Sequence, residues 1–125
     1  MYGRWPHKVD AGEDHLTVDG RRIGFSSTAR LDRPSDVDVV LECTGKWTTA
    51  EDMAAFWAHG AKKVVVSGPV DGVLNVVMGV NHALYAPLRD HIVTAASCTT
   101  NCLAPIVQVV KERFGIRHGV ITTIH

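Results

Sequence analysis

The chain has little that would draw it to nucleic acid or into a membrane. Its 13 Lys and Arg residues equal its 13 Asp and Glu residues in number, so the formal net charge at pH 7 is zero. A nucleic-acid partner therefore has no electrostatic support. No apolar run approaches the roughly 20 residues that cross a bilayer. The N-terminal "MYGRWPHKVD" also lacks the apolar core of a signal peptide. We expect a protein that binds neither nucleic acid nor membrane.

Cysteine is scarce, since the chain holds only Cys43, Cys98 and Cys102. A small disulfide-rich secreted scaffold is therefore excluded, and a reducing, cytoplasmic compartment is expected. The chain also lacks CxxC pairs and zinc-type ligand spacing, so we predict no metal site. A disulfide between Cys98 and Cys102 is disfavoured because helical i, i+4 geometry keeps the Cα atoms near the upper limit for bridging. Cys43 and Cys102 are predicted to be small buried side chains.

The N-terminal part of the chain has the pattern of short strands. In "HLTVDGRRIGF", Asp19-Gly20 separates two short runs in which apolar and polar residues alternate. An Asp-Gly pair readily adopts the left-handed backbone of a tight two-residue turn, which makes it the strongest local hairpin signal. We therefore predict a β-hairpin centred on these two residues.

The middle of the chain alternates between strand and helix patterns. Two apolar, β-branched runs end at glycine, as buried strands do: "DVDVVLECTG" and "KKVVVSGP". Between them, residues 48–60 have helical apolar spacing, with Thr48 and Glu51 at capping-box spacing and Gly60 as a stop signal. A strand, helix and strand over about thirty residues predict a βαβ crossover with parallel strands, and hence an α/β fold.

The last third of the chain continues this alternation. Strand patterns occur in "NVVMGV" (75–80), "HIVTAAS" (91–97) and the final "HGVITTIH" (118–125). Between the last two, "CTTNCLAPIVQVVKERFG" has apolar residues on one helical face and ends at Gly115, which predicts a helix. Pro105 would remove one hydrogen bond of this helix and kink its first turns.

Cys98 falls where the predicted strand 91–97 passes into this helix. Free backbone N–H groups and the positive end of the helix dipole favour an anion there, and a thiolate is such an anion. Neighbouring hydroxyls could hold a bound oxyanion, as helix N-termini hold phosphate: Ser97, Thr99 and Thr100. Cys98 is thus either a reactive nucleophile or a small buried side chain.

Two motifs of the chain carry a family resemblance. "ASCTTNCLAP" followed by "GVITTIH" resembles the active-site signature of the phosphorylating glyceraldehyde-3-phosphate dehydrogenase family. The 27 positions from Cys98 to His125 are also similar to the spacing of that family's nucleophile and base. Four upstream segments resemble further parts of the family: "YGRW", "VDVVLECTG", "KKVVVSGP" and "VVMGVNH". The resemblance therefore covers essentially the whole chain.

The resemblance implies an oxidoreductase that converts glyceraldehyde 3-phosphate to an acyl phosphate with NAD or NADP and inorganic phosphate. Cys98 would attack the aldehyde and form a thioester, with His125 as the base. Ser97 and Thr99 would hold the attacking phosphate. The resemblance places three further residues along the cofactor groove: Thr44, Gly45 and Ser67. Members of this family are typically homotetramers, which is the expected assembly of the full-length protein.

The family's glycine-rich G-x-G-x-x-G motif is absent, as is the acidic residue that follows it. The resemblance therefore implies that the first βαβ unit of the cofactor domain lies before Met1. We expect residues 1–97 to form a partial Rossmann-like parallel sheet, the C-terminal half of the NAD(P)-binding domain. Residues 98–125 would be the first helix and strand of the α+β catalytic domain. The chain would then be a truncated gene product, one piece of a split gene or a partial sequence, inactive on its own.

Several alternatives stay open. The segment "GPVDGVLNVVMGVN" resembles the family members encoded beside arsenical exporters, which would use arsenate and form 1-arseno-3-phosphoglycerate. Erythrose-4-phosphate dehydrogenase is another relative with the same cysteine chemistry. Cys98 and His125 could instead serve a cysteine hydrolase or acyltransferase that needs no nicotinamide. The chain could also be a non-catalytic remnant.

Overall fold

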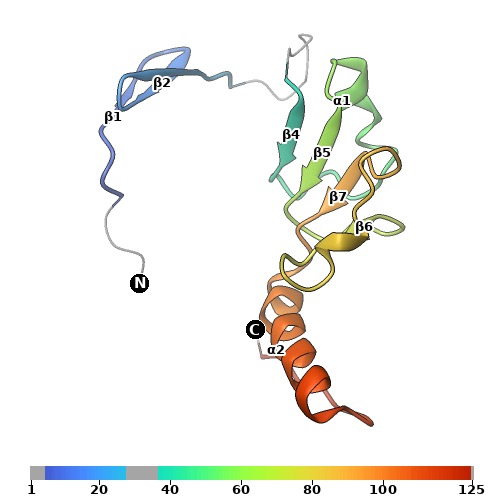
Figure 1. The fold of residues 1–125 in the computed structure, drawn as a ribbon. Helices are drawn as coiled ribbons and strands as arrows, with labels where there is room; N and C mark the ends of the chain where they lie inside the picture. The colour runs from blue at the N-terminus through green and yellow to red at the C-terminus, as the bar shows by residue number, and fades with distance from the viewer. Residues whose placement is uncertain (1–4, 28–36, 125) are drawn as a thin grey trace. The chain divides into compact units, whose positions relative to one another are not determined.

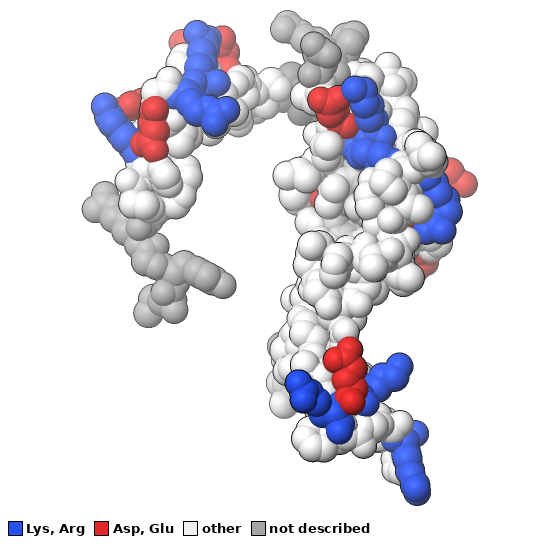
Figure 2. Space-filling view, viewed as in Figure 1, with Lys and Arg blue, Asp and Glu red and all other residues white. Residues whose placement is uncertain are grey.

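The computed structural model describes residues 5–27 and 37–124. The chain divides into two compact units, Met1–Leu31 and Asp32–His125, and each has a sheet of its own (Figure 1). None of the described helices is both long and apolar enough to cross a membrane. Basic and acidic side chains lie next to one another on the face shown in Figure 2. Among the ion pairs of the described residues are Arg22–Asp14 and Lys62–Asp38.

The first unit is an antiparallel sheet of three strands: β1 (Val9–Ala11), β2 (His15–Val18) and β3 (Arg21–Gly24). The turn between β2 and β3 consists of Asp19 and Gly20, with φ values of 47° and 82°. Positive φ at both central residues defines the turn whose twist matches that of a hairpin. The predicted hairpin is confirmed.

Asp19 also binds the segment that precedes β1, through contacts with His7 and Lys8. Its carboxylate accepts hydrogen bonds from the backbone N–H of Lys8 at 3.0 Å and lies 2.5 Å from Nδ1 of His7. These contacts hold the pKa of Asp19 below its ordinary value, the His7 contact most strongly. The turn residue therefore has a second role, because it ties the start of the sheet to the hairpin.

The second unit contains a parallel sheet of four strands in the order β4-β5-β7-β6. Its strands are β4 (Val39–Glu42), β5 (Lys63–Val66), β6 (Leu74–Asn75) and β7 (Ile92–Thr94). Helix α1 (Ala54–Ala58) lies between β4 and β5 in the chain (Figure 1). The predicted βαβ crossover and the α/β fold class are confirmed.

One face of the parallel sheet packs against the α1 segment. On β5, Val64 and Val66 are buried whereas Lys63 and Val65 are only half-buried, as the alternation of side chains along a strand requires. Val64 and Val66 join Met53, Phe56, Ala61 and Val70 in the core. The rings of Trp47 and Phe56 stack at a centroid distance of 4.5 Å and close one side of this core.

The helix predicted over 48–60 is much shorter, because α1 includes only Ala54–Ala58. The predicted capping box of Thr48 and Glu51 is wrong by one position. Thr49 and Asp52 make it instead: Asp52 Oδ2 accepts from the Thr49 N–H at 3.1 Å, and Thr49 Oγ1 accepts from the Asp52 N–H at 3.2 Å. These bonds fix a turn rather than a longer helix. Gly60, with φ of 95°, ends the helix as predicted.

The strand predicted over 75–80 is also wrong beyond its first residue. β6 ends at Asn75, and the chain then turns toward a short 3-10 helix, η1 (His82–Leu84). The side chain of Asn81 causes this turn, since its Oδ1 accepts from the Val77 N–H at 2.7 Å and its Nδ2 donates to the Asn75 carbonyl at 2.8 Å. These bonds use the backbone groups that a longer strand would need.

Helix α2 (Cys98–Phe114) follows β7 and has the predicted bounds, with Gly115 after it at φ of 74°. It continues through Pro105. The strand predicted for the final segment is wrong within the described residues, because 118–124 form no strand there. A strand needs a neighbour to bond with, and no strand in the described part of the chain pairs with this segment.

Candidate active site

Three neighbouring strands, β4, β5 and β7, end at the same edge of the parallel sheet. Glu42 is in register with Val66, and Val66 with Thr94. The bonds continue one residue past the strands, from the Ser67 N–H to the Glu42 carbonyl at 2.9 Å and from the Ala95 N–H to the Val66 carbonyl at 2.8 Å. The carboxyl edge of an open α/β sheet is where such folds bind their ligands.

Every described residue of the predicted site follows one of these three strand ends. Thr44 and Gly45 follow β4, Ser67 follows β5, and three residues follow β7: Ser97, Cys98 and Thr99. The parallel register therefore brings the predicted cofactor residues and the predicted nucleophile to one edge of the sheet. His125 lies outside the described residues, so its pairing with Cys98 stays a prediction.

Cys98 is the first residue of α2, and its side chain is exposed. Ser97 caps the helix, since its Oγ accepts a hydrogen bond from the Thr100 N–H at 3.1 Å. The N–H groups of the first turn have no partner further back in the helix, and the positive end of the dipole lies beside the sulfur. The structure thus presents the Cys98 thiol to solvent where a negative charge is favoured.

The buried alternative for the cysteines is not what the structure shows. Cys43 and Cys102, both predicted to be buried, are exposed, as is Cys98. Cys43 is exposed because it follows the last residue of β4, whereas the preceding Glu42 points into the protein. Burial therefore does not separate the three thiols, and Cys98 alone stands at a helix N-terminus.

Glu42 is a site residue that the sequence analysis missed. Its side chain is only 3% exposed, and its Oε1 accepts hydrogen bonds from the Thr44 N–H at 2.8 Å and from the Thr44 hydroxyl. Its Oε2 is buried and has no hydrogen-bond partner among the described residues. Glu42 therefore holds the turn that carries Thr44 and Gly45. An acidic residue at the end of an apolar strand was the available signal.

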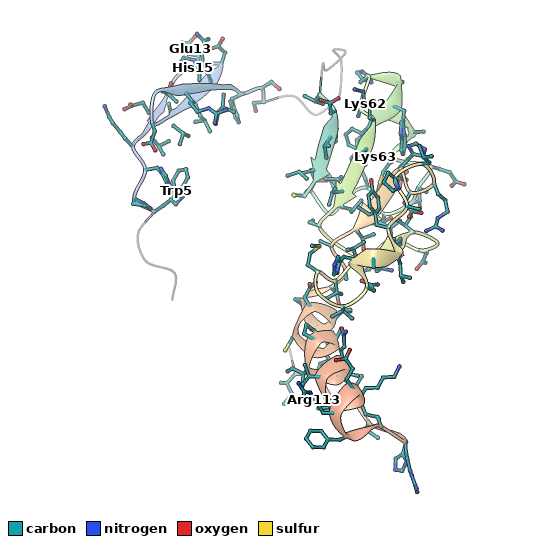
Figure 3. The ribbon with its side chains drawn as sticks, in the orientation of Figure 1. Trp5, Glu13, His15, Lys62, Lys63 and Arg113 are labelled. Carbon is teal, nitrogen blue, oxygen red and sulfur yellow. The ribbon has the colours of Figure 1, made fainter. Side chains whose placement is uncertain are left out.

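A pocket of about 670 Å³ runs along the sheet and reaches the turn before α2, where Thr94, Ala95 and Asn101 contribute to its lining. Lys63, labelled in Figure 3, lies at the other side of this pocket. Its ammonium donates to the carbonyls of Pro87 and Asp90, the latter at 2.9 Å, and lies 5.8 Å from the centre of the Tyr85 ring. Lys63 therefore anchors the loop before β7.

Within residues 5–27 and 37–124, no three His, Cys, Asp or Glu side chains lie together in a way that could hold a metal ion.

Comparison with known proteins finds relatives of the whole chain. A sequence profile of the glyceraldehyde 3-phosphate dehydrogenase C-terminal domain matches residues 97–125. All of the chain aligns with glyceraldehyde-3-phosphate dehydrogenase 3 of Nostoc sp., at 46% identity over 39% of that protein. The Chlamydia pneumoniae enzyme is 43% identical over 99% of the chain and 38% of its own length. The Geobacillus stearothermophilus enzyme is 39% identical over all of the chain and 39% of its own length.

The chain belongs to the glyceraldehyde-3-phosphate dehydrogenase family. It spans about two fifths of the length of the curated relatives that it matches. The resemblance drawn from the sequence motifs is therefore confirmed, as is an α/β fold with a parallel sheet. The boundary predicted between residues 97 and 98 stays a prediction.

The local structure shows where the two predicted phosphate-binding residues, Ser97 and Thr99, lie. The Ser97 hydroxyl lies 2.8 Å from that of Thr100 and already accepts a backbone bond. Thr99, the next residue after Cys98, is half-buried in the first turn of α2. Ser97 therefore has a structural role as the cap of α2, in addition to any contact with an anion.

Proposed function

We propose that the chain supplies the nucleophile and part of the cofactor edge of a glyceraldehyde-3-phosphate dehydrogenase. The reaction would be the oxidation and phosphorylation of glyceraldehyde 3-phosphate to an acyl phosphate. The observation that carries the proposal is the position of Cys98, which is exposed at the N-terminus of α2 and at the sheet edge that it shares with the ends of β4 and β5.

Cys98 would act as a thiolate. Its sulfur attacks the aldehyde carbon, and the backbone N–H groups at the start of α2 stabilise the negative oxygen that develops. His125 would carry the proton released by the thiol, give it to this oxygen to form the hydroxyl, and take it back as the carbon loses its hydride. The product of this oxidative half of the reaction is a thioester on Cys98. Inorganic phosphate, held by Ser97 and Thr99, then attacks the thioester carbon, so that the acyl phosphate leaves and the thiolate returns.

Bound NAD or NADP would supply the hydride acceptor. The residues at the edge fit the nicotinamide half of such a cofactor. Gly45 has φ of 69° and no atom within 4 Å of the place where a Cβ would stand, while Ser67 is exposed. Thr44 keeps its orientation through Glu42. The adenine half would need the glycine-rich motif, which these 125 residues do not contain.

The activity is proposed for a longer protein that carries this segment. In it, residues 1–97 would form the C-terminal part of the NAD(P)-binding domain and 98–125 the start of the catalytic domain. That protein would be a cytoplasmic homotetramer that acts on a small phosphorylated aldehyde.

The test is a pair of cysteine variants in the full-length enzyme, assayed by nicotinamide reduction with glyceraldehyde 3-phosphate and phosphate. Cys98→Ser should reduce activity to background, because a serine hydroxyl is not ionised near neutral pH. Cys102→Ser, one helical turn further on, is the matched control and should keep most of the activity. Full activity of Cys98→Ser would contradict the proposal. Acyl transfer without nicotinamide would support a cysteine acyltransferase instead.

An arsenate-linked reaction is the second candidate. Between β5 and β6 the chain makes only a short connection, in which Gly72 turns with φ of 71°, and the sequence has no charged insert there. This short connection is the feature that resembles the arsenate-associated members. Steady-state kinetics with arsenate and with phosphate would decide, since the arsenate reaction predicts a higher kcat/KM with arsenate. A strong phosphate preference would contradict it.

A further inference from the structure

The turn between β7 and α2, which delivers Cys98, has a strained residue at its centre. Ala96 has φ of 58° and is only 4% exposed. A residue with a Cβ adopts this left-handed conformation only at an energetic cost, which its surroundings have to offset. Cys98 follows Ala96 by two positions and is the first residue of α2. Any relaxation of Ala96 would therefore turn the sulfur away from its present position.

The sheet holds this turn from one side. Thr94 is 1% exposed, and its Oγ1 accepts a hydrogen bond from the Ala96 N–H at 3.0 Å. The same hydroxyl donates to Oδ1 of Asn75, on β6, at 2.5 Å. The Ala95 N–H is bound to the Val66 carbonyl. The N–H groups of the turn are thus satisfied by the sheet.

Helix α2 holds the turn from the other side through Asn101, whose backbone N–H donates to the Ser97 carbonyl at 2.9 Å and whose side chain makes two further bonds. Nδ2 of Asn101 donates to the Ala95 carbonyl at 2.6 Å and to the Ser97 carbonyl at 3.0 Å. These two carbonyls lie on either side of Ala96. The amide nitrogen of asparagine carries two hydrogens, so both donors of Asn101 are used on this turn.

We propose that Asn101 is a positioning residue, whose amide holds Ala96 in the left-handed conformation that aims the Cys98 sulfur. The role requires a side chain with two donors at this distance. Aspartate has the same size but can only accept when ionised, so it would repel both carbonyls. The part of the proposal that concerns turnover rests on the proposed function of Cys98, whereas the part that concerns the turn does not.

The test compares Asn101→Asp with a matched control in the full-length enzyme. The control is Gln108→Ala, which removes an amide of the same helix that donates to Oε1 of Glu112 at 2.9 Å. Three quantities are measured: kcat and KM, the rate of Cys98 alkylation by iodoacetamide, and the thermal midpoint. We expect Asn101→Asp to lower kcat about tenfold, the effect of losing two hydrogen bonds. The alkylation rate should fall about two- to fivefold, which is the advantage that the helix dipole gives an anion at Cys98. Gln108→Ala should change neither rate.

A second pair of variants tests the strained residue itself. Glycine adopts a positive φ without steric cost. The double variant Ala96→Gly, Asn101→Ala should therefore regain at least half of the alkylation rate that Asn101→Ala alone loses. Asn101→Ser keeps one donor, so its alkylation rate should lie between that of the parent and that of Asn101→Ala. This variant replaces Asn101→Asp in the test if Asn101→Asp does not fold.

Two results would overturn the positioning role. One is an alkylation rate in Asn101→Asp equal to that of the parent. The other is a lowered thermal midpoint with both rates unchanged in the folded protein, which would make Asn101 a merely stabilising residue. If Cys98→Ser stays active, the proposed function fails, but the alkylation rates still decide the role of Asn101.

Discussion

The Ser97 hydroxyl accepts a hydrogen bond from the Thr100 N–H at 3.1 Å, and this bond caps α2 directly before Cys98. Capping residues satisfy one of the free donors at a helix start, and replacing serine by alanine costs about 1 kcal/mol. The residue predicted to hold phosphate is thus also the residue that begins the helix. Substitutions at Ser97 can separate the two roles.

Ser97→Ala should lower the free energy of unfolding by about 1 kcal/mol, measured by denaturant titration of the full-length enzyme. Ser97→Asn is the control, because asparagine caps helices as well as serine but has no hydroxyl. If the hydroxyl binds phosphate, both variants should raise the KM for phosphate while only Ser97→Ala loses stability. An unchanged phosphate KM in both would leave Ser97 as a cap alone.

Cys98 should be alkylated faster than the other two thiols although all three are exposed. The dipole of α2 stabilises an anion at Cys98 by roughly 0.3–1 kcal/mol, which corresponds to a rate advantage of about two- to fivefold. Site-resolved mass spectrometry after brief iodoacetamide treatment gives the three rates. The advantage should shrink at high salt, because screening weakens the dipole. Equal rates for Cys98 and Cys102 at low salt would contradict this explanation.

Glu42→Ala should destabilise the protein by about 1–3 kcal/mol, because it leaves the Thr44 N–H without its partner. Glu42→Gln keeps an accepting oxygen toward Thr44 and places an amide where the buried Oε2 has no partner among the described residues. Glu42→Gln should therefore lose less free energy of unfolding than Glu42→Ala. Denaturant unfolding at neutral pH measures both. Equal losses would indicate that the charge of Glu42 itself is needed, through a partner outside the described residues.

How much of this structure the sequence predicted depends on how local the signal was. Asp19-Gly20 carries the hairpin within two residues, and the bounds of α2 follow from Ser97 and Gly115. The strand over 75–80 was wrong because Asn81, from outside it, captures the Val77 N–H. The final strand was wrong because strand formation needs a neighbour that the segment itself cannot specify.

The candidate site divides in the same way. Cys98 could be found because the strand pattern and the helix pattern meet at it, and both are periodic signals. For Glu42 the sequence offered only an acidic residue at the end of an apolar strand, and for Asn101 it offered no signal. Their contacts to Thr44 and to Ala95 depend on how a turn folds back on itself. No spacing rule in the sequence predicts a left-handed Ala96. The position of the proposed nucleophile was therefore predictable, and the groups that hold it were not.

Asp90 should make the loop before β7 resistant to acid. Its carboxylate accepts from the Arg89 guanidinium and from the Ala86 N–H at 2.7 Å, and these bonds, the Arg89 bond first, lower its pKa to about 2. A lowered pKa in the folded state means that the contribution to stability is full above the unfolded value of about 4 and is lost as pH falls toward 2.

Asp90→Asn is the variant that tests this dependence, since it keeps the shape of the side chain and removes the titration. The difference in unfolding free energy between the parent and Asp90→Asn should be constant above about pH 5 and shrink between about pH 4 and 2. Asp10→Asn is a suitable control, because Asp10 is exposed and its ion pair with Lys8 is long, at 3.5 Å. A difference that stays constant down to pH 2 would contradict the role of Asp90.

The 125-residue chain alone should fold poorly and turn over no substrate. The face of the parallel sheet away from α1 is apolar and open, since Leu41 is 69% and Val39 49% exposed. Exposed apolar strands associate with one another, so we expect concentration-dependent aggregation, measured by light scattering. Leu41→Thr should reduce it, because the substitution removes apolar surface from the open face. Val64→Thr, on the fully buried opposite face, should increase it by weakening the core. A cooperative melt of the isolated chain together with cofactor reduction would contradict the prediction, because it would mean that the open face needs no cover and that the site is complete within these residues.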